Sequence, residues 1–461
     1  MKRKSLLVFF IAVLFVLSFS VEFDKVYLEN HRRLKSIFSF TLDFEQAKEI
    51  IQKHYPQLKT DEEVLQFIED KKIQKYEIDG EMFYFEEMEA NLFYRDFELI
   101  KKTEGWGQRY RSFTDSFFKS YYHEEINGTD FKSDLSPYFN PREYLVEYSI
   151  KVDKDKLPDK GHIKLWTPLP LQTACQEDIE IIKIEPFEAV IGYPKTTGDI
   201  GYINFDLDLE KYDGLDISVM YSFKHYQQEF VVDLDEIGKY DKESVLYKTY
   251  TESSKNIFYN NEMKALALSI VGDETNPYLM AKKIYYYVVE NIYYSLIAHS
   301  YLEAENIPES LAVFEHGYGD CGAQSMFFSA LCRSLGIPAR TTGGFQIFFN
   351  NLGDHFWAEF YLPNYGWVPV DTSVGQIGVY SYWLNEEERE KFVGFFFGSQ
   401  DAMRMVVQKN VDVSPGVVPD DVQILSMVLQ IPFIDVDYGN ENYEISIEII
   451  MNTETKTYFI K

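Results

Sequence analysis

The chain has only three cysteines in 461 residues, and no two of them form a Cys-x-x-Cys pair. A zinc site built from paired thiolates is therefore not expected. Because three is odd, at least one of Cys175, Cys321 and Cys332 keeps a free thiol or joins another chain. Cysteines of exported proteins tend to pair or to be absent, so each of the three needs its own interpretation, and Cys175 receives none from the sequence.

Basic residues are scarce relative to acidic ones. The chain has 45 Lys and Arg against 74 Asp and Glu, which gives a formal net charge of −29. A general nucleic-acid binder carries a basic footprint, so the composition argues against nucleic acid as a partner. A surface of this charge repels anionic polymers and anionic lipid and keeps the protein in solution.

Long hydrophobic runs are absent after the first twenty residues, since no later stretch approaches the ~18 apolar residues of a membrane helix. Residues 1–20 begin with three basic residues and continue with 12 apolar residues from Leu6 to Leu17. Small residues, Ser18 and Ser20, precede the expected cut. This order is typical of a secretory signal peptide. We expect export to the periplasm, cell surface or medium, with an uncleaved N-terminal membrane anchor as the alternative.

The rest of the chain divides into segments with different patterns of apolar and polar residues. Residues 21–138 have helical spacing and a capping-box pattern at 60–63, which predict a helical N-terminal domain. Residues 140–235 alternate apolar and polar residues between turns, which predicts a β-sandwich-like domain. Residues 255–385 contain helices followed by strands, and residues 386–461 indicate a C-terminal β-rich extension. The expected fold class is therefore α+β, with several domains.

The segment with the clearest chemistry is Gly-Tyr-Gly-Asp-Cys-Gly-Ala-Gln-Ser at 317–325. Apolar residues follow Cys321 at the spacing of one helix face, and Gly336 and Pro338 end the pattern. Cys321 is thus expected at a helix N-terminus, where free N–H groups and the helix dipole favour a thiolate and could hold an oxyanion. Cys332 lies inside the same helix and is expected to be buried and inert.

Two further residues follow Cys321 in an order that suits nucleophilic catalysis. His355 comes 34 positions later, within Gly-Asp-His-Phe-Trp-Ala-Glu, and Asp371 ends Gly-Trp-Val-Pro-Val-Asp. On this interpretation Cys321 attacks an acyl carbon, His355 takes the thiol proton and later protonates the leaving amine, and Asp371 orients the imidazole. A lone histidine on a strand is usually structural, so the prediction depends on the order of all three residues.

Strand pairing decides whether His355 and Asp371 can meet. Residues 363–366 are expected to form the turn between two strands. If Phe360 pairs with Gly366, the same register puts His355 directly opposite Asp371. A tighter turn would send the two side chains to opposite faces, so we expect the longer loop or a β-bulge.

These motifs resemble the transglutaminase-like superfamily, which has a papain-like thiol fold. The resemblance covers about residues 255–385, and its motifs are Gly319-Asp-Cys-Gly322, Leu335-Gly-Ile-Pro-Ala-Arg340, His355-x-Trp-x-Glu359 and Gly366-Trp-Val-Pro-Val-Asp371. The region before it, with Leu-Trp-Thr-Pro-Leu-Pro at 165–170, is similar to the β-domain that precedes such cores in exported bacterial relatives.

The resemblance implies a Cys-His-Asp thiol acyltransferase or a cysteine-type peptidase or amidase that acts on an amide of a protein or peptide. It also implies that an aromatic residue before the cysteine supports the oxyanion. Tyr294 is our candidate for that role, with simple core packing as the alternative. Trp357 is expected to shield the three catalytic residues, and Glu359 is expected to be structural.

We expect neither a metal ion nor another cofactor, because no calcium-binding pattern is evident in the sequence. A different class of function remains open: a non-catalytic surface or binding protein that has kept the scaffold. The complete set of three residues argues against that alternative, and flanking segments of unknown role argue for it. Association with the cell envelope and the oligomeric state are left open.

Overall fold

The computed structural model of the protein describes residues 39–96, 98–99, 116–127, 136–157, 160–348, 351–381, 383–413, 428–437 and 452–459. The expected signal peptide at residues 1–20, with its alternative as a membrane anchor, lies outside these residues. Within the described ranges no helix has the length and apolar character that a membrane crossing requires.

The described part of the N-terminal domain, expected to be mostly helical over 21–138, combines helices with a small sheet that the sequence did not indicate. Helices α2 (Phe44–His54), α3 (Asp61–Asp70) and α4 (Met88–Arg95) share a core with an antiparallel sheet of order β1 (Phe40–Leu42), β3 (Glu81–Phe85) and β2 (Lys75–Ile78). The capping box is present, with Thr60 accepting from the Glu63 N–H. The aromatic residues at 83–85 form β3, because bulky rings fit a pleated, half-buried surface.

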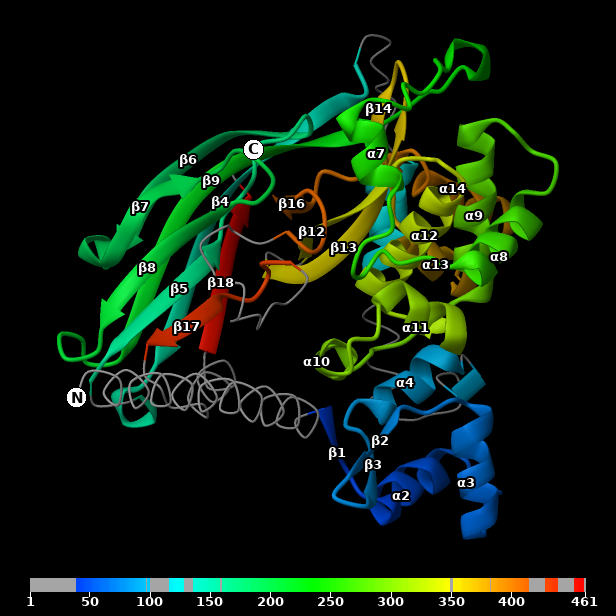
Figure 1. Cartoon of the computed structure of the whole chain (residues 1–461), viewed down its shortest axis with the longest axis horizontal. Coiled ribbons are helices and arrows are strands. Elements are labelled where there is room, and N and C mark those ends of the chain that lie inside the picture. The colour runs from blue at the N-terminus through cyan, green and yellow to red at the C-terminus, as the bar shows by residue number, and fades with distance from the viewer. Residues whose placement is uncertain are drawn as a thin grey trace, which may run out of the picture.

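Two facing sheets form a sandwich beside the core, as Figure 1 shows. One sheet has the order β15 (Ser399–Gln400), β9 (Leu215–Glu229), β4 (Tyr138–Val152) and β18 (Asn452–Phe459), with β6 (Gln176–Glu185) also paired to β9. The other has the order β17 (Phe433–Asp437), β5 (His162–Pro168), β8 (Tyr202–Asp208) and β7 (Val190–Lys195). Alternate residues of β8 and β9 are buried in one shared core, which is the physical source of the alternation seen in the sequence.

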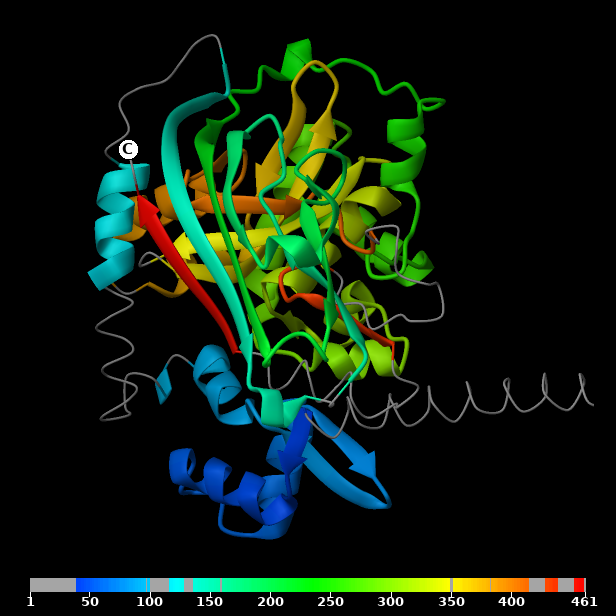
Figure 2. The same cartoon turned by 90° about the vertical axis from the view of Figure 1, so that its left-hand side faces the viewer.

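The C-terminal residues 386–461, expected to form a β-rich extension, contribute a helix and several strands that complete earlier sheets. After helix α14 (Glu386–Phe395), the chain adds β15 and β18 to one sandwich sheet and β17 to the other. Strand β16 (Arg404–Gln408) instead joins the sheet of the core. Figure 2 shows these late strands lying beside much earlier ones. Alternation predicts a strand but not its partner, because pairing depends on residues far away in the sequence.

The core has a four-stranded antiparallel sheet in the order β14 (Gly366–Val370), β13 (Asn351–Leu362), β12 (Ala339–Phe348) and β16. Its central helix is α12 (Cys321–Ser334). The other core elements are α7 (Val245–Thr251), α8 (Asn261–Val271), α9 (Pro277–Asn291), β10 (Tyr293–Tyr294), α10 (His299–Ala304), α11 (Glu309–His316), β11 (Tyr318–Gly319) and α13 (Thr372–Tyr380). Short helical turns occur at η1 (Tyr122–Ile126), η2 (Lys154–Lys156), η3 (Phe187–Ala189) and η4 (Leu234–Glu236).

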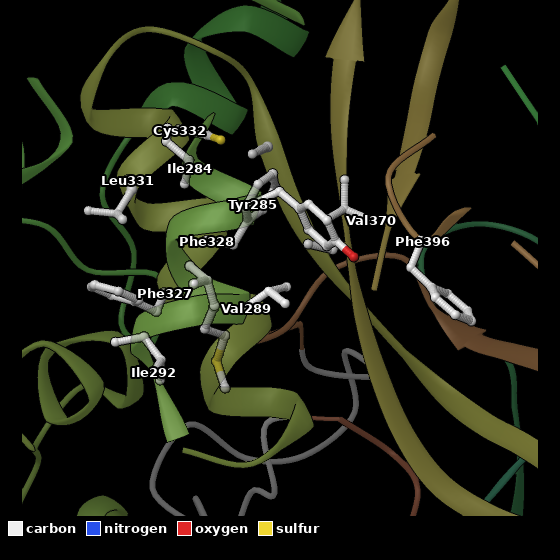
Figure 3. Packing of buried hydrophobic residues seen from close by; sticks show 14 of the residues in the cluster. Ile284, Tyr285, Val289, Ile292, Phe327, Phe328, Leu331, Cys332, Val370 and Phe396 are labelled. Carbon is white, nitrogen blue, oxygen red and sulfur yellow. The ribbon is translucent and has the colours of Figure 1, made fainter. Parts of the chain in front are cut away.

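Helix α12 is held firmly because every residue after its first is buried. Its side chains Phe327, Phe328 and Leu331 pack together with Ile284 and Val289 of α9 (Figure 3). A fully buried side chain of this size contributes about 1.5–3 kcal/mol relative to an exposed one. The start of α12 is therefore a rigid place on which to mount a reactive group.

Candidate active site

Cys321 is the first residue of α12 and, unlike the rest of that helix, is partly exposed. Asp320 caps the helix, with its Oδ1 accepting from the Ala323 N–H at 3.0 Å. The position expected from the sequence is therefore observed. As the first helical residue, Cys321 has a backbone N–H without an acceptor inside the helix, so this N–H can serve a ligand at the same end as the thiol.

The glycines on either side of Cys321 allow close packing around it. A Cβ on Gly319 would lie 2.8 Å from the Val313 side chain, and one on Gly322 would lie 3.2 Å from the Phe356 ring. Contacts this short leave little space for any side chain. Strand β13, which carries Phe356, thus passes directly beside the start of α12.

Opposing influences act on the pKa of the Cys321 thiol. Burial raises the pKa of the Cys321 thiol well above its usual value, and the charges of Asp320 and Asp371 act in the same direction. The backbone N–H groups of Phe356 and Gly322 lower it, but not enough to offset burial. The helix start alone therefore does not set the pKa of this thiol, and the base expected from the sequence, His355, would take its proton.

His355 and Asp371 form a buried hydrogen-bonded pair. His355 Nε2 lies 2.8 Å from Asp371 Oδ2, and the two residues are 6 % and 1 % exposed. A carboxylate only accepts, so Nε2 carries the proton in the neutral ring and Nδ1 is left as the basic nitrogen. The next residue, Phe356, directs its N–H to the Cys321 thiol, so the strand that carries His355 passes beside that thiol.

The strand register that brings this pair together differs from the expected one. Leu362 pairs with Gly366 around a three-residue turn in which Asn364 has a φ of 76°. The predicted pairing of Phe360 with Gly366 is thus wrong by two residues. A shift of two keeps every side chain on its face, because side chains alternate with a period of two.

Asp371 reaches His355 because the strand ends just before it. β14 stops at Val370, and Asp371 becomes the N-cap of α13, with its Oδ1 accepting from the Val374 N–H at 3.0 Å. The cap leaves Oδ2 free to accept from His355. The contact between the two side chains therefore depends on this strand-to-helix change as well as on β pairing.

Sequence reasoning missed two buried residues behind this pair. Arg404 donates from Nη1 to Asp371 Oδ2 at 2.7 Å and from Nη2 to Asp401 Oδ2 at 2.9 Å. Burial alone would raise the pKa of Asp371, but His355 and Arg404 hold it well below its usual range. Arg404 lies 33 positions after Asp371 on a strand whose partner the sequence does not indicate, so no signal in the sequence pointed to it.

A cleft of about 960 Å³ opens beside Cys321, and Tyr294 lines it. Strand β10 pairs in parallel with β11, which sets Tyr294 alongside Gly319, two residues before Cys321. The Tyr294 ring also packs edge-on against Tyr94 of the N-terminal domain, with ring centroids 5.0 Å apart. Tyr294 therefore combines a place in the cleft with a packing contact, and its oxyanion role stays a prediction.

The wall of this cleft carries a histidine held between two carboxylates. His299 Nδ1 lies 2.8 Å from Glu309 Oε1, and its Nε2 lies 2.5 Å from Asp320 Oδ2. Burial alone would lower the pKa of His299, but the two acids raise it well above its usual value. The resulting imidazolium offsets the negative charge of Asp320, which otherwise opposes a thiolate at Cys321.

The N-terminal domain holds the loop that leads to this histidine. The Asn91 side chain donates to the Leu296 carbonyl at 2.9 Å and accepts from the Leu296 N–H at 2.7 Å. Gln74 donates to the same carbonyl at 2.8 Å and accepts from the Ala298 N–H at 3.0 Å. These side chains hydrogen-bond the loop backbone as a neighbouring strand would, so the N-terminal domain shapes one edge of the cleft.

The other two thiols are buried away from the cleft. Cys332 is 0 % exposed among the apolar residues of α9 and α12 (Figure 3), and burial raises its pKa. Cys175 is also buried, and burial raises its pKa to about 12.

Trp357 is buried beside His355, with ring centroids 6.1 Å apart, and Glu359 pairs with Arg340. In the described part of the chain no group of three His, Cys, Asp or Glu is arranged to hold a metal ion.

Comparison with known proteins places part of the chain in a family. An uncharacterized protein of Haemophilus influenzae is 25 % identical over 286 residues, covering 54 % of this chain and 72 % of that protein. A candidate cysteine protease from Cytophaga hutchinsonii has 14 % identity and a TM-score of 0.42, covering 70 % of this chain and 93 % of that one. The periplasmic domain of TgpA from Pseudomonas aeruginosa has 12 % identity and a TM-score of 0.28, covering 57 % and 99 %. Residues 264–372 match the model of the transglutaminase-like superfamily. This stretch contains Cys321, His355 and Asp371, and it is a transglutaminase-like domain.

Proposed function

We propose that the protein is a thiol enzyme in which Cys321, His355 and Asp371 cleave or transfer an amide acyl group of a protein or peptide. The observation that carries this proposal is the buried hydrogen bond between His355 and Asp371 beside a cleft lined by Cys321. The transglutaminase-like domain supports the same reading.

The first half of the reaction forms a thioester. His355 Nδ1 takes the Cys321 proton as the sulfur attacks the carbonyl carbon, and Asp371 stabilises the resulting imidazolium. The negative oxygen of the tetrahedral intermediate accepts from the Cys321 backbone N–H, with Tyr294 as the proposed second donor. The C–N bond then breaks, and the leaving amine takes the proton from the imidazolium.

The second half returns the free enzyme. Water or an amine loses a proton to His355 Nδ1 and attacks the thioester carbon, the C–S bond breaks, and Cys321 takes the proton back. Water gives a carboxylic acid, and an amine gives a new amide. Both outcomes use the same three residues, so the nucleophile that reaches the cleft decides between hydrolysis and transfer.

Native labelling with iodoacetamide followed by peptide mapping tests the assignment of the nucleophile. We expect Cys321 to be the fast-reacting thiol, because His355 assists it and it lines the cleft, whereas Cys175 and Cys332 are buried. All three should react after unfolding, and His355→Gln should slow Cys321 alone. Equal native labelling of Cys332, or no effect of His355→Gln, would reject the thiol-enzyme proposal and favour a binding protein on the same scaffold.

Casein provides a direct assay of the reaction. Incorporation of a fluorescent primary amine reports transfer, and release of ammonia or new amino groups from casein whose lysines are dimethylated, without added amine, reports hydrolysis. Cys321→Ala serves as the blank in both assays.

We also propose that the protein acts outside the cytoplasm. The support is the basic, apolar and small-residue order of residues 1–20. N-terminal sequencing of the protein from its native cells is expected to start at Val21. An intact Met1 in the membrane fraction would favour the anchor instead, and an intact Met1 with cytosolic markers would rule out export.

A further inference from the structure

A buried array of alternating charges lies behind His355. Asp371 Oδ2 accepts both from His355 Nε2 at 2.8 Å and from Arg404 Nη1 at 2.7 Å. Arg404 also donates from Nε and Nη2 to Asp401 Oδ2, at 3.2 and 2.9 Å. Asp371, Asp401 and Arg404 are at most 1 % exposed. One guanidinium is thus shared between two carboxylates, of which only one touches the imidazole.

We propose that Arg404 and Asp401 are positioning residues that set, through Asp371, how strongly His355 holds its proton. Arg404 draws the charge of Asp371 away from the imidazolium, because both bind the same oxygen. Asp401 counteracts this by sharing the Arg404 charge. The inference rests on the proposed function of His355 as the base. It adds two opposing charges, those of Arg404 and Asp401, that the three residues alone do not contain.

The geometry of the array is fixed from all sides. Asp371 Oδ1 is occupied by the Ser373 hydroxyl at 3.2 Å and by the N–H of the α13 cap, so the carboxylate cannot turn away. Asp401 Oδ1 accepts from the Met403 N–H at 2.9 Å, and its Oδ2 accepts from the Tyr121 hydroxyl at 2.8 Å. Each carboxylate is therefore held in place independently of Arg404.

The array is buried, which strengthens its electrostatics. The buried Trp357 ring lies 5.2 Å from the Arg404 guanidinium and 6.1 Å from the His355 ring. The Trp357 ring is thus close to both Arg404 and His355, and the shielding role expected from the sequence stays a prediction. In such surroundings an adjacent opposite charge shifts a titration by about one pH unit or more.

Several other titratable groups lie near the array. They are Cys321 and Tyr285 near Asp371, and Glu125, Arg142, Tyr144 and His225 near Asp401 or Arg404. Glu125 and Arg142 pair with each other. Burial lowers the pKa of His225 to about 3, so it is neutral. Arg404 is therefore the cation shared by Asp371 and Asp401 in the described part of the chain.

The test is an NMR titration of the His355 ring in protein labelled at histidine, in a Cys321→Ala background so that no acyl chemistry intervenes. The His355 signal is assigned by its loss in His355→Gln. Arg404→Met is expected to move the titration midpoint upward, because Asp371 then serves the imidazolium alone. Asp401→Asn is expected to move it downward, because the whole Arg404 charge falls on Asp371. Each shift should be about one pH unit.

Two further variants separate charge from structure. Arg333 is a second buried arginine of the core, bonded to the Ala339 and Glu252 carbonyls rather than to a carboxylate. Arg333→Met should lower thermal stability without moving the His355 midpoint. Arg404→Lys keeps the charge and should restore a midpoint near that of the parent. If Arg404→Met does not fold, the nearly isosteric Asp401→Asn still tests the proposal, because its midpoint must move downward.

The outcomes are distinct from those of the proposed function. Opposite shifts in Arg404→Met and Asp401→Asn support the charge balance even if casein is never turned over. The charge balance is overturned, even if casein turnover is present, when Arg404→Met and Asp401→Asn leave the midpoint unmoved or move it in the same direction, or when Arg333→Met moves it as far as Arg404→Met does.

Discussion

Replacing Asp371 with asparagine is expected to lower turnover of casein amides by about 10⁴ while the domain stays folded. If the amide oxygen faces Val374, the amide NH₂ group meets Arg404 and His355. Arginine has no acceptor to offer, and the imidazole must then accept at Nε2 and carry its proton on Nδ1. In that tautomer His355 cannot take the proton of Cys321.

The opposite amide orientation also fails. With the oxygen facing His355 and Arg404, the NH₂ group meets the Val374 N–H and the Ser373 hydroxyl, where Asp371 now accepts both. Two donors then oppose each other at the start of α13, and the cap is lost. A neutral amide in either orientation stabilises the imidazolium less than a carboxylate does.

A matched control for Asp371→Asn exists in the N-terminal domain. Asp43 caps α2 by accepting from the Gln46 N–H at 2.8 Å, and asparagine caps a helix about as well as aspartate. Asp43→Asn should therefore leave turnover and the melting temperature unchanged. Turnover by Asp371→Asn at the level of Asp43→Asn would remove Asp371 from the proposed mechanism.

Features that depend on neighbouring residues could be predicted from the sequence. Helical spacing after Cys321 and the stop at Gly336 and Pro338 located α12 correctly, because capping and periodicity are local properties. The contact between His355 and Asp371 was also expected, although the register behind it was off by two residues. Because side chains alternate along a β-strand, an error of two residues left each side chain on its predicted face. The helix cap at Asp371 then brings its carboxylate within reach of His355.

Features that depend on long-range pairing could not be predicted. Arg404 enters the site because β16 pairs with β12, with Gln346 opposite Arg404, and nothing near residue 404 in the sequence indicates that partner. The same reason hid the contacts of Asn91 and Gln74 with the cleft loop. The effect of burial on the pKa of the Cys321 thiol could not be predicted either, because burial is a property of the assembled fold.

Replacing Gly344 with alanine is expected to destabilise the core sheet and displace β16. Gly344 lies on β12 between His355 of β13 and Val406 of β16. An added Cβ would lie 2.0 Å from the Met405 carbonyl oxygen and 3.2 Å from the Val406 Cα. Backbone atoms cannot turn aside as a side chain does, so the two strands must separate.

Overpacking of this kind typically costs about 1–3 kcal/mol of unfolding free energy, which urea denaturation of Gly344→Ala would measure. Gly353 provides the matched control on the neighbouring strand, because its added Cβ would meet only the Gln346 carbonyl oxygen at 3.7 Å. Gly353→Ala should have the same unfolding free energy as the parent protein. Since β16 begins at Arg404, Gly344→Ala should also move the His355 titration midpoint upward, as loss of the Arg404 contact does. An unfolding free energy equal to that of Gly353→Ala would show that the strands yield without cost, and would contradict the close pairing on which the position of Arg404 depends.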